Sequence, residues 1–338
     1  MTRAGARLGG VDSSTRVRAA LEGGKADRPP AGAWGHTYRE EWNAEQLAEV
    51  TVDRARRLGW DFVKFQPRAT FFAEAFGNRY RPAGHRLKGP ILEDAAVPDL
   101  DAWSRLELVD QGVLDEQARA IGLVARELGD GVPVIQTVFS PLSVGDYLVG
   151  REKRRLIREL RQHPDVVLPA LEKVQDALID FARKSVEAGA AGIFYAISGF
   201  ATPDAMPVDV YDNLVFPIDL RITESFPAAA WFNVVHLCGS HVNMDVARRL
   251  PVGAVSYSVH NAGNPSLAEA RRLTGKAVMG GLEQRGALVG GPAEAIEEQV
   301  RQAIAETGGD HLLLAPGCSV PPRAREENLA VMMRAAAA

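Results

Sequence analysis

The sequence predicts a single α/β domain of the (β/α)8, or TIM barrel, type, with long loops over the carboxyl ends of the strands. Short apolar segments alternate with helical patterns along the 338 residues, and eight strand candidates are each followed by a helical segment. Alternating strands and helices indicate a parallel sheet, and eight such units are typical of a closed barrel. A doubly wound open sheet is the alternative, but no Gly-x-Gly-x-x-Gly follows the first strand candidate.

The N-terminal segment is predicted to be a disordered tail over residues 1–15, and the barrel domain covers 16–338. Ser14 to Arg16 precede a short helix at 17–21, which Gly23 and Gly24 end. Pro29 and Pro30 then favour an extended chain that leads into the first strand.

The elements of the barrel are recognised by short apolar runs for strands and by apolar residues three or four positions apart for helices. The strands are expected at 31–36, 61–65, 132–139, 191–197, 229–238, 254–259, 277–282 and 311–315. The helices are expected at 44–58, 114–128, between 139 and 188, and at 208–225, 243–250, 266–274, 292–307 and 325–334.

Two long segments are expected to cover the carboxyl ends of the strands, where TIM barrels carry their active sites. One spans residues 66–110, and the other spans 140–163 with a helical insertion at 144–161. The basic run 151–155 within the second segment is expected to be a solvated helix face.

Charge, apolar runs and cysteine content indicate which partners the protein lacks and in which compartment it is expected. A formal net charge of −4 without blocks of like charge favours neither nucleic acid nor a membrane surface as a partner. No apolar run is long enough for a membrane span or a secretory signal, so we expect a cytoplasmic protein. Its two cysteines cannot form a disulfide framework and remain available as metal ligands.

The strongest chemical signal is the segment that ends in His236, Leu237 and Cys238. In a strand, residues two apart point to the same side, so the imidazole and the thiol face one point. Cys318 also follows an apolar run and supplies a third ligand. Two cysteines and a histidine suit Zn²⁺, and three protein ligands with one open position are typical of catalytic zinc. The alternative is a buried cysteine and a structural histidine, but the barrel places all three residues at one mouth.

Other side chains at the strand ends complete the predicted site. His260 and Glu283 are the expected catalytic groups. His260 is interpreted as a displaceable fourth ligand, a hydrogen-bond partner of a ligand or a structural histidine, and Glu283 as a partner of His236, a proton acceptor or a helix cap. Four residues are expected to line the cofactor pocket: His36, Lys64, Tyr195 and Ser198.

Several segments together resemble the uroporphyrinogen decarboxylase superfamily over about residues 15–334. They are 132–142, 236–239, 280–283, the pair Gly317-Cys318 and 327–329. This superfamily contains decarboxylases of a porphyrinogen, which need no metal, and zinc-dependent enzymes that transfer a methyl group from a methylated corrinoid to a thiol.

The motifs favour the second branch. Decarboxylases of this superfamily carry Arg-Gln-Ala-Gly-Arg-Tyr near the N-terminus and Phe-Ser-Asp after the second strand, whereas this chain has 33–39 as Ala-Trp-Gly-His-Thr-Tyr-Arg and 63–68 as Val-Lys-Phe-Gln-Pro-Arg. The His-x-Cys motif with a distant cysteine is similar to that of the methylcobamide:coenzyme M methyltransferases.

The resemblance therefore implies a methyltransferase with Zn²⁺ as cofactor, a methylcobamide or other methylated corrinoid as methyl donor, and a small thiol as acceptor. The chain has no Asp-x-His-x-x-Gly cobalamin-binding signature, so a transiently bound corrinoid protein is expected as partner. Two alternatives remain open: a decarboxylase-like lyase acting on a tetrapyrrole, and a non-catalytic accessory protein that binds zinc or corrinoid.

Overall fold

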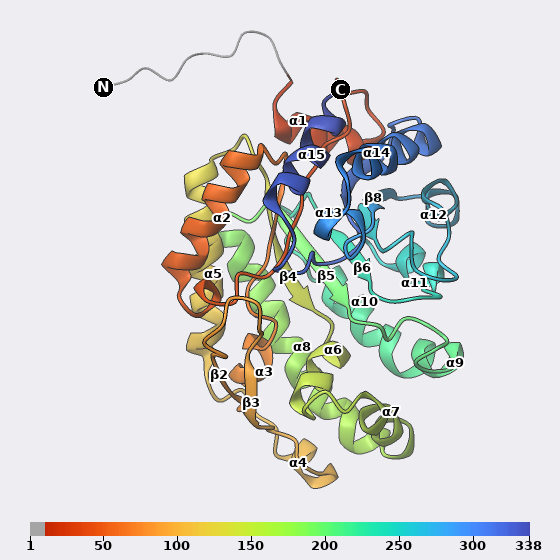
Figure 1. Cartoon of the computed structure of the whole chain (residues 1–338). Coiled ribbons are helices and arrows are strands. Elements are labelled where there is room, and N and C mark those ends of the chain that lie inside the picture. Colours follow the sequence, from red (N-terminus) through yellow and green to blue (C-terminus); the bar gives the residue numbers. More distant parts are fainter. Residues whose placement is uncertain (1–10) are drawn as a thin grey trace.

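A curled sheet of seven parallel strands forms the centre of the computed structural model, which describes residues 11–338 (Figure 1). Neighbouring strands follow the chain order, as expected for repeated strand and helix units. The strands are β1 (Val63–Phe65), β4 (Val134–Phe139), β5 (Gly192–Ile197), β6 (Val234–Leu237), β7 (Ala254–Ser256), β8 (Ala277–Leu282) and β9 (Leu312–Pro316).

The prediction of eight strands is wrong by one, because residues 31–36 do not form a regular strand in the described chain. Ala31 makes only an isolated parallel bridge to Leu314 of β9. Pro30 has no amide proton, and the amide of Ala31 donates to a side-chain oxygen of Asp61, 2.9 Å away. The amide of Asp61 in turn donates to the Ala31 carbonyl, so this extended segment lies between β9 and the start of β1.

The first helix, α1 (Ser13–Glu22), begins earlier than predicted. Asp12 accepts a hydrogen bond from the amide of Thr15 at 2.7 Å and caps the helix, so the predicted tail over residues 1–15 is too long. Residues 1–10, the rest of that predicted tail, lie outside the described part of the chain.

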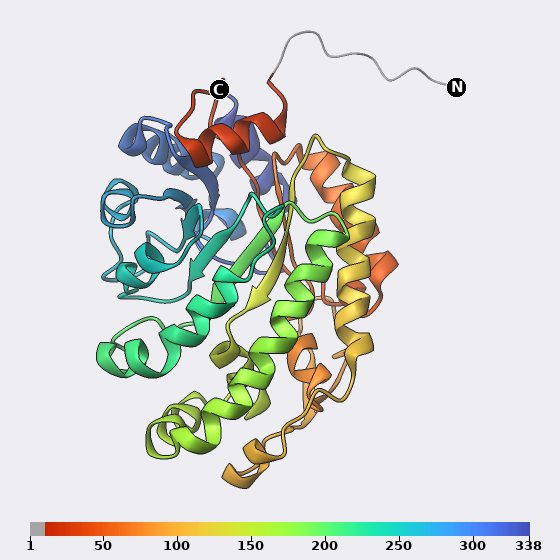
Figure 2. The same ribbon diagram turned by 180° about the vertical axis from the view of Figure 1, so that it is seen from behind.

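The remaining helices of the repeating units pack around the sheet. Seen from behind, α5 and α8 lie side by side over the strands, in yellow and green (Figure 2). These helices are α2 (Ala44–Leu58), α5 (Gln111–Leu128), α8 (Pro164–Glu187), α10 (Phe216–Glu224), α11 (Met244–Arg249), α12 (Leu267–Thr274), α14 (Ala293–Thr307) and α15 (Glu326–Ala336). Shorter helical turns are η1 (Glu40–Trp42), α9 (Val208–Val210), the π-helical η2 (Tyr211–Val215) and α13 (Ala287–Gly290).

Both long segments contain regular structure beyond the carboxyl ends of the strands (Figure 1). The segment after β1 folds into α3 (Phe71–Ala75), the antiparallel pair β2 (Arg79–Arg81) and β3 (Ile91–Asp94), and α4 (Leu100–Ser104). The segment after β4 forms two helices, α6 (Pro141–Leu148) and α7 (Lys153–Gln162), in place of the single insertion predicted at 144–161.

Side chains of the sheet alternate between two apolar layers. Phe194 of β5 and Val234 of β6 face the inner layer enclosed by the strands, whereas Tyr195 and Val235 face the helices. His236 has the parity of Val234 and therefore points inward. None of the described helices is long and apolar enough to span a membrane.

Candidate metal centre

Three ligand atoms converge where β6 and β9 end. One ring nitrogen of His236 and the sulfurs of Cys238 and Cys318 all lie within 4.8 Å of one another. The backbone holds Cys238 in place, because its amide donates to the carbonyl of Ile197 at the end of β5 at 3.1 Å. The structure thus brings together the three residues predicted as metal ligands.

The donor set fits Zn²⁺. Zinc binds sulfur at about 2.3 Å and imidazole nitrogen at about 2.0 Å in tetrahedral geometry, so its ligand atoms lie roughly 3.5–4 Å apart. The observed grouping within 4.8 Å requires only small side-chain movements to reach that geometry.

His236 is oriented by neighbours that the sequence did not single out. Its Nδ1 lies 3.1 Å from the hydroxyl of Ser256, and its ring stacks on Phe194 with centroids 5.2 Å apart. Ser256 lies opposite His236 in the register between β6 and β7. With Nδ1 bonded to a hydroxyl, Nε2 is the nitrogen left to bind a metal.

Hydrogen bonds within the cluster favour the charged form of one of the two thiols. The Cys238 thiol donates to Cys318, and His236 also bonds to that sulfur, so the pKa of Cys318 lies well below its ordinary value despite burial. A thiolate is the form of cysteine that binds metals.

Lys64 of β1 is buried near Cys318. Burial lowers the pKa of its ammonium to about 7, while the charges of Cys318 and Glu41 act in the opposite direction. Its Nζ lies 4.9 Å from the ring centroid of Phe194 and donates to the side-chain oxygen of Gln66.

A directed chain of hydrogen bonds continues from Lys64 away from the ligands. Because an ammonium only donates, the oxygen of Gln66 faces Lys64 and its NH₂ group faces His36 Nε2, 3.1 Å away. His36 Nδ1 then donates to Glu41, which is almost fully buried, at 2.9 Å. The Ser319 hydroxyl also donates to the Gln66 oxygen at 3.4 Å, so a side branch of this chain joins it to the residue that follows Cys318.

The predicted catalytic residues lie outside the ligand cluster. His260 is exposed, and its Nε2 lies 3.0 Å from the carbonyl of Gly281. Glu283 is half-buried, and its carboxylate lies so close to Gly286 that a Cβ there would be 2.0 Å from it. Ser256, not Glu283, is the described partner of the His236 ring.

Of the residues predicted to line the cofactor pocket, His36 and Lys64 share the chain described above. Tyr195 does not reach the inner layer, because its parity in β5 turns it toward the helices, where its hydroxyl donates to the buried Asp219 at 2.5 Å. Ser198 lies after β5, and its carbonyl accepts a hydrogen bond from Lys153 at 3.3 Å.

Lys153 belongs to the run 151–155, which was expected to be a solvated helix face, but it is half-buried and connects α7 to the loop beside Cys238. Its Nζ donates to the Gly199 carbonyl at 2.9 Å, and burial lowers the pKa of the ammonium. Gly199 has φ +74°, and a Cβ at this position would lie 3.0 Å from the Lys153 ammonium and 3.5 Å from the Cys238 carbonyl.

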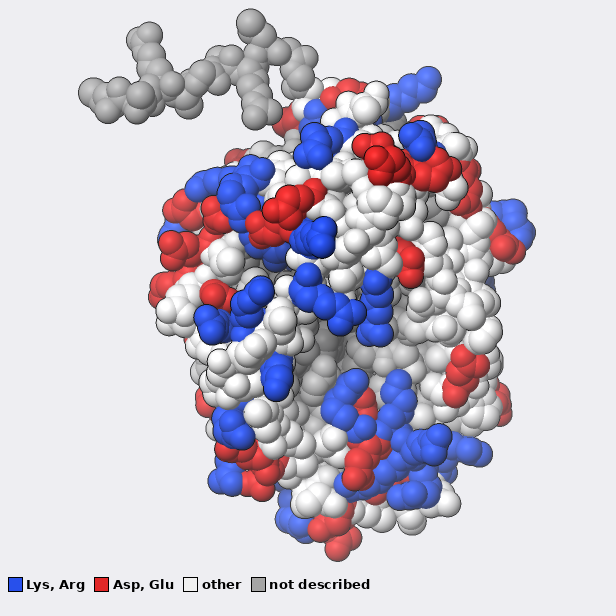
Figure 3. Space-filling view, in the orientation of Figure 1, with Lys and Arg blue, Asp and Glu red and all other residues white. Residues whose placement is uncertain are grey.

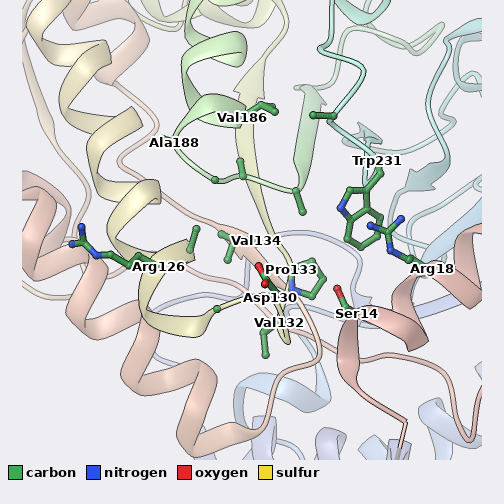
Figure 4. A pocket seen from close by; sticks show the side chains of 16 residues that line it. Ser14, Arg18, Arg126, Asp130, Val132, Pro133, Val134, Val186, Ala188 and Trp231 are labelled. Carbon is green, nitrogen blue, oxygen red and sulfur yellow. The ribbon is translucent and has the colours of Figure 1, made fainter.

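The two ends of the sheet present different surfaces. A hollow opens in the face seen in Figure 3, where lysine and arginine side chains surround it. At the amino ends of β4 and β5, a separate pocket of about 660 Å³ is lined by residues including Arg18, Asp130 and Trp231, with the Arg18 guanidinium 3.7 Å from the Trp231 ring centroid (Figure 4). This pocket contains none of the three ligand residues.

Known proteins similar to this chain include both methyltransferases and decarboxylases. The methylcobamide:CoM methyltransferase MtaA of Methanosarcina barkeri is 25% identical over 341 residues, covering 95% of this chain and 96% of MtaA. A uroporphyrinogen decarboxylase of Syntrophotalea carbinolica is 26% identical over 301 residues, covering 86% of this chain and 82% of the relative.

Solved structures share the fold. A methyltransferase from Methanosarcina mazei superposes with a TM-score of 0.78 at 22% identity, covering 96% of this chain and 98% of that one. A B12-independent methionine synthase from Shewanella sp. W3-18-1, in complex with selenomethionine, superposes with a TM-score of 0.58 at 17% identity and covers 86% of each chain.

The family model described as uroporphyrinogen decarboxylase (URO-D) matches residues 12–338. The resemblance predicted from the strand-end motifs is therefore confirmed for the family, and the match extends over nearly all of the described chain. The chain belongs to the uroporphyrinogen decarboxylase (URO-D) family.

Proposed function

We propose that this protein is a zinc-dependent methyltransferase that moves a methyl group from a methylated corrinoid, carried by a separate protein, to a thiol acceptor. The observation that carries the proposal is the convergence of His236, Cys238 and Cys318 within 4.8 Å. The similarity to MtaA over 95% of the chain, in a relative named for this reaction, supports the same conclusion.

His236, Cys238 and Cys318 would hold the zinc ion. When bound, zinc lowers the pKa of an acceptor thiol so that the thiolate, the reactive nucleophile, forms at neutral pH. Two cysteine thiolates and a neutral histidine give the site no net charge, so the acceptor sulfur keeps its nucleophilic character.

The transfer itself is balanced without a further reactant. The acceptor sulfur forms a bond to the methyl carbon as the cobalt–carbon bond of the donor breaks, and both electrons of that bond stay on the corrinoid cobalt. The proton of the acceptor thiol leaves to solvent. Ser256 and Phe194 keep the His236 ring in place, and the Lys64 ammonium lies within electrostatic reach of Cys318.

The first test is metal content. Purified protein should hold about one zinc per chain, whereas Cys238→Ala and Cys318→Ala should lose most of it while keeping the circular dichroism of the folded protein. His163→Ala changes an exposed histidine outside the cluster and serves as the matched control. A full zinc complement in both cysteine variants would contradict the assignment.

The second test addresses the acceptor. Cobalt-substituted protein should change its visible spectrum and release a proton when a thiol binds, so 2-mercaptoethanesulfonate and homocysteine are compared, followed by turnover with free methylcobalamin. No spectral change with any thiol would indicate a closed structural site. Uroporphyrinogen serves as the counter-substrate, and its decarboxylation above background would favour the other branch of the family.

A further inference from the structure

Helix α7 is fixed to the protein by its inner face. Leu156 and Leu160 are fully buried, and Glu159 accepts a hydrogen bond from the indole of Trp103 at 2.8 Å. Arg155 on the flank pairs with Glu159 at 2.7 Å. The inner side of this helix is therefore held by apolar packing and by the bonds of Glu159, although Nη2 of Arg155 is buried without a hydrogen-bond partner.

The outer face of α7 carries an unneutralised positive charge. Arg154, Arg158 and Arg161 are exposed, and none has a carboxylate within ion-pair distance among the described residues. With Ile157 and Gln162 they line a shallow hollow of about 340 Å³. Like charges three or four residues apart repel one another and destabilise an isolated helix. No ion pair in the described chain offsets this repulsion on the outer face of α7.

The outer face of α7, formed by Arg154, Ile157, Arg158, Arg161 and Gln162, belongs to a helix whose first residue contacts the loop next to Cys238. Lys153, the first residue of α7, bonds to the Gly199 carbonyl in the loop that contacts Cys238. Figure 3 shows lysine and arginine side chains gathered where Figure 1 places α7, below the hollow in that face.

We propose that the outer face of α7 is a docking surface for an acidic protein, the carrier that brings the methylated corrinoid to the metal centre. This inference rests on the proposed function. The chemistry favours a protein partner, because the face has one apolar residue and no aromatic ring, whereas single-stranded nucleic acids use aromatic stacking and membrane-surface helices need a wide apolar face.

Charge reversal tests the docking surface directly. The wild type is compared with Arg154→Glu/Arg158→Glu and with the control Arg126→Glu/Arg334→Glu, which changes exposed arginines in the last turns of α5 and α15, at the opposite end of the strands. A fluorescent polyglutamate peptide should bind the wild type in low salt, bind the α7 variant at least about tenfold more weakly, and bind the control within about twofold of wild type.

A second probe tests whether docking serves the reaction. Methylcobalamin coupled to polyglutamate imitates an acidic carrier, and wild type should show a KM about tenfold lower for it than for free methylcobalamin. The α7 variant should lose this difference while keeping wild-type turnover of free methylcobalamin and wild-type zinc content.

The outcomes separate the two proposals. Lack of turnover of free methylcobalamin by the wild type would contradict the proposed function, whereas peptide binding is measured independently of it. Equal peptide binding by all three proteins, or an equal KM for both methyl donors in the wild type, would overturn the docking proposal. Tighter binding of single-stranded DNA than of a peptide of equal charge would also overturn it.

Discussion

The imidazole of His236 depends on one hydroxyl from the neighbouring strand. Ser256 lies 3.1 Å from Nδ1 and fixes which ring nitrogen is free. We predict that Ser256→Ala lowers zinc affinity about 10- to 100-fold, because partners of metal-binding histidines orient the ring. Competition with a zinc-binding dye measures the change.

Ser185→Ala is the control for this prediction, since Ser185 is equally buried but bonds only within α8, to the carbonyl of Phe181. Unchanged zinc affinity in Ser256→Ala would show that Phe194 and the strand alone hold the ring.

Asp219 predicts a dependence of stability on pH. It is buried between the hydroxyls of Tyr195 and Tyr211, and burial raises its pKa from 3.8 to about 6. The Asp219 carboxyl therefore binds its proton more tightly in the folded protein than in the unfolded chain. Protonation of Asp219 contributes fully to the free energy of unfolding below about pH 4. This contribution, roughly 3 kcal/mol at most, is lost as the pH rises through 6.

The comparison is between wild type and Asp219→Asn, which cannot ionise. In urea unfolding, the free energy of the wild type should fall relative to that of the variant between pH 4 and 7. Parallel pH profiles of the two proteins would show that Asp219 keeps an ordinary pKa.

At the residue scale, the sequence predicts what depends on spacing and misses what depends on contacts between elements. His236, Cys238 and Cys318 follow apolar runs, so their common location could be inferred from strand ends. Ser256 and Gln66 meet their partners only through strand register and side-chain geometry. The side-chain direction of Tyr195 depends on the parity of β5, which the sequence alone does not determine.

At the element scale, β5 and the residues before β6 approach unusually closely at Gly192. A Cβ at this position would lie 2.2 Å from the carbonyl oxygen of Phe232. We predict that Gly192→Ala destabilises the protein by about 3 kcal/mol or more, because the clash is with backbone and cannot be relieved by a side-chain rotation.

Thermal unfolding measures this effect. Gly131→Ala is the control, since Gly131 is exposed and a Cβ there has no heavy atom within 4 Å. Similar melting temperatures for the two variants would mean that the strands separate easily at this point.

The element boundaries show why the fold class was easier to predict than its details. Alternating apolar runs and helical patterns predicted most strands and helices of the repeating units within a few residues. The division of the 140–163 segment into α6 and α7 was missed, because Gly150 and Arg151 adopt positive φ values between them. The prediction of a first strand at 31–36 is wrong for another local reason, because the amide of Ala31 donates to the side chain of Asp61.

For the whole molecule, the proposed metal joins distant parts of the chain. A ligand that binds only the folded state stabilises it, by about 4 kcal/mol at a free concentration a thousand times its dissociation constant. We predict that a chelator lowers the melting temperature of the wild type by several degrees and leaves that of Cys318→Ala unchanged. Scanning calorimetry with and without the chelator measures both, and equal shifts would point to a metal bound elsewhere.

The position of the ligands along the chain also has a consequence during translation. Cys318 comes 80 residues after Cys238, which at 5–20 residues per second corresponds to about 4–16 s of synthesis. Throughout that interval a nascent chain displays His236 and Cys238 without their third partner. A metal captured early would be held by two groups and exchange readily, so the order of synthesis itself delays stable metallation until β9 has joined the sheet.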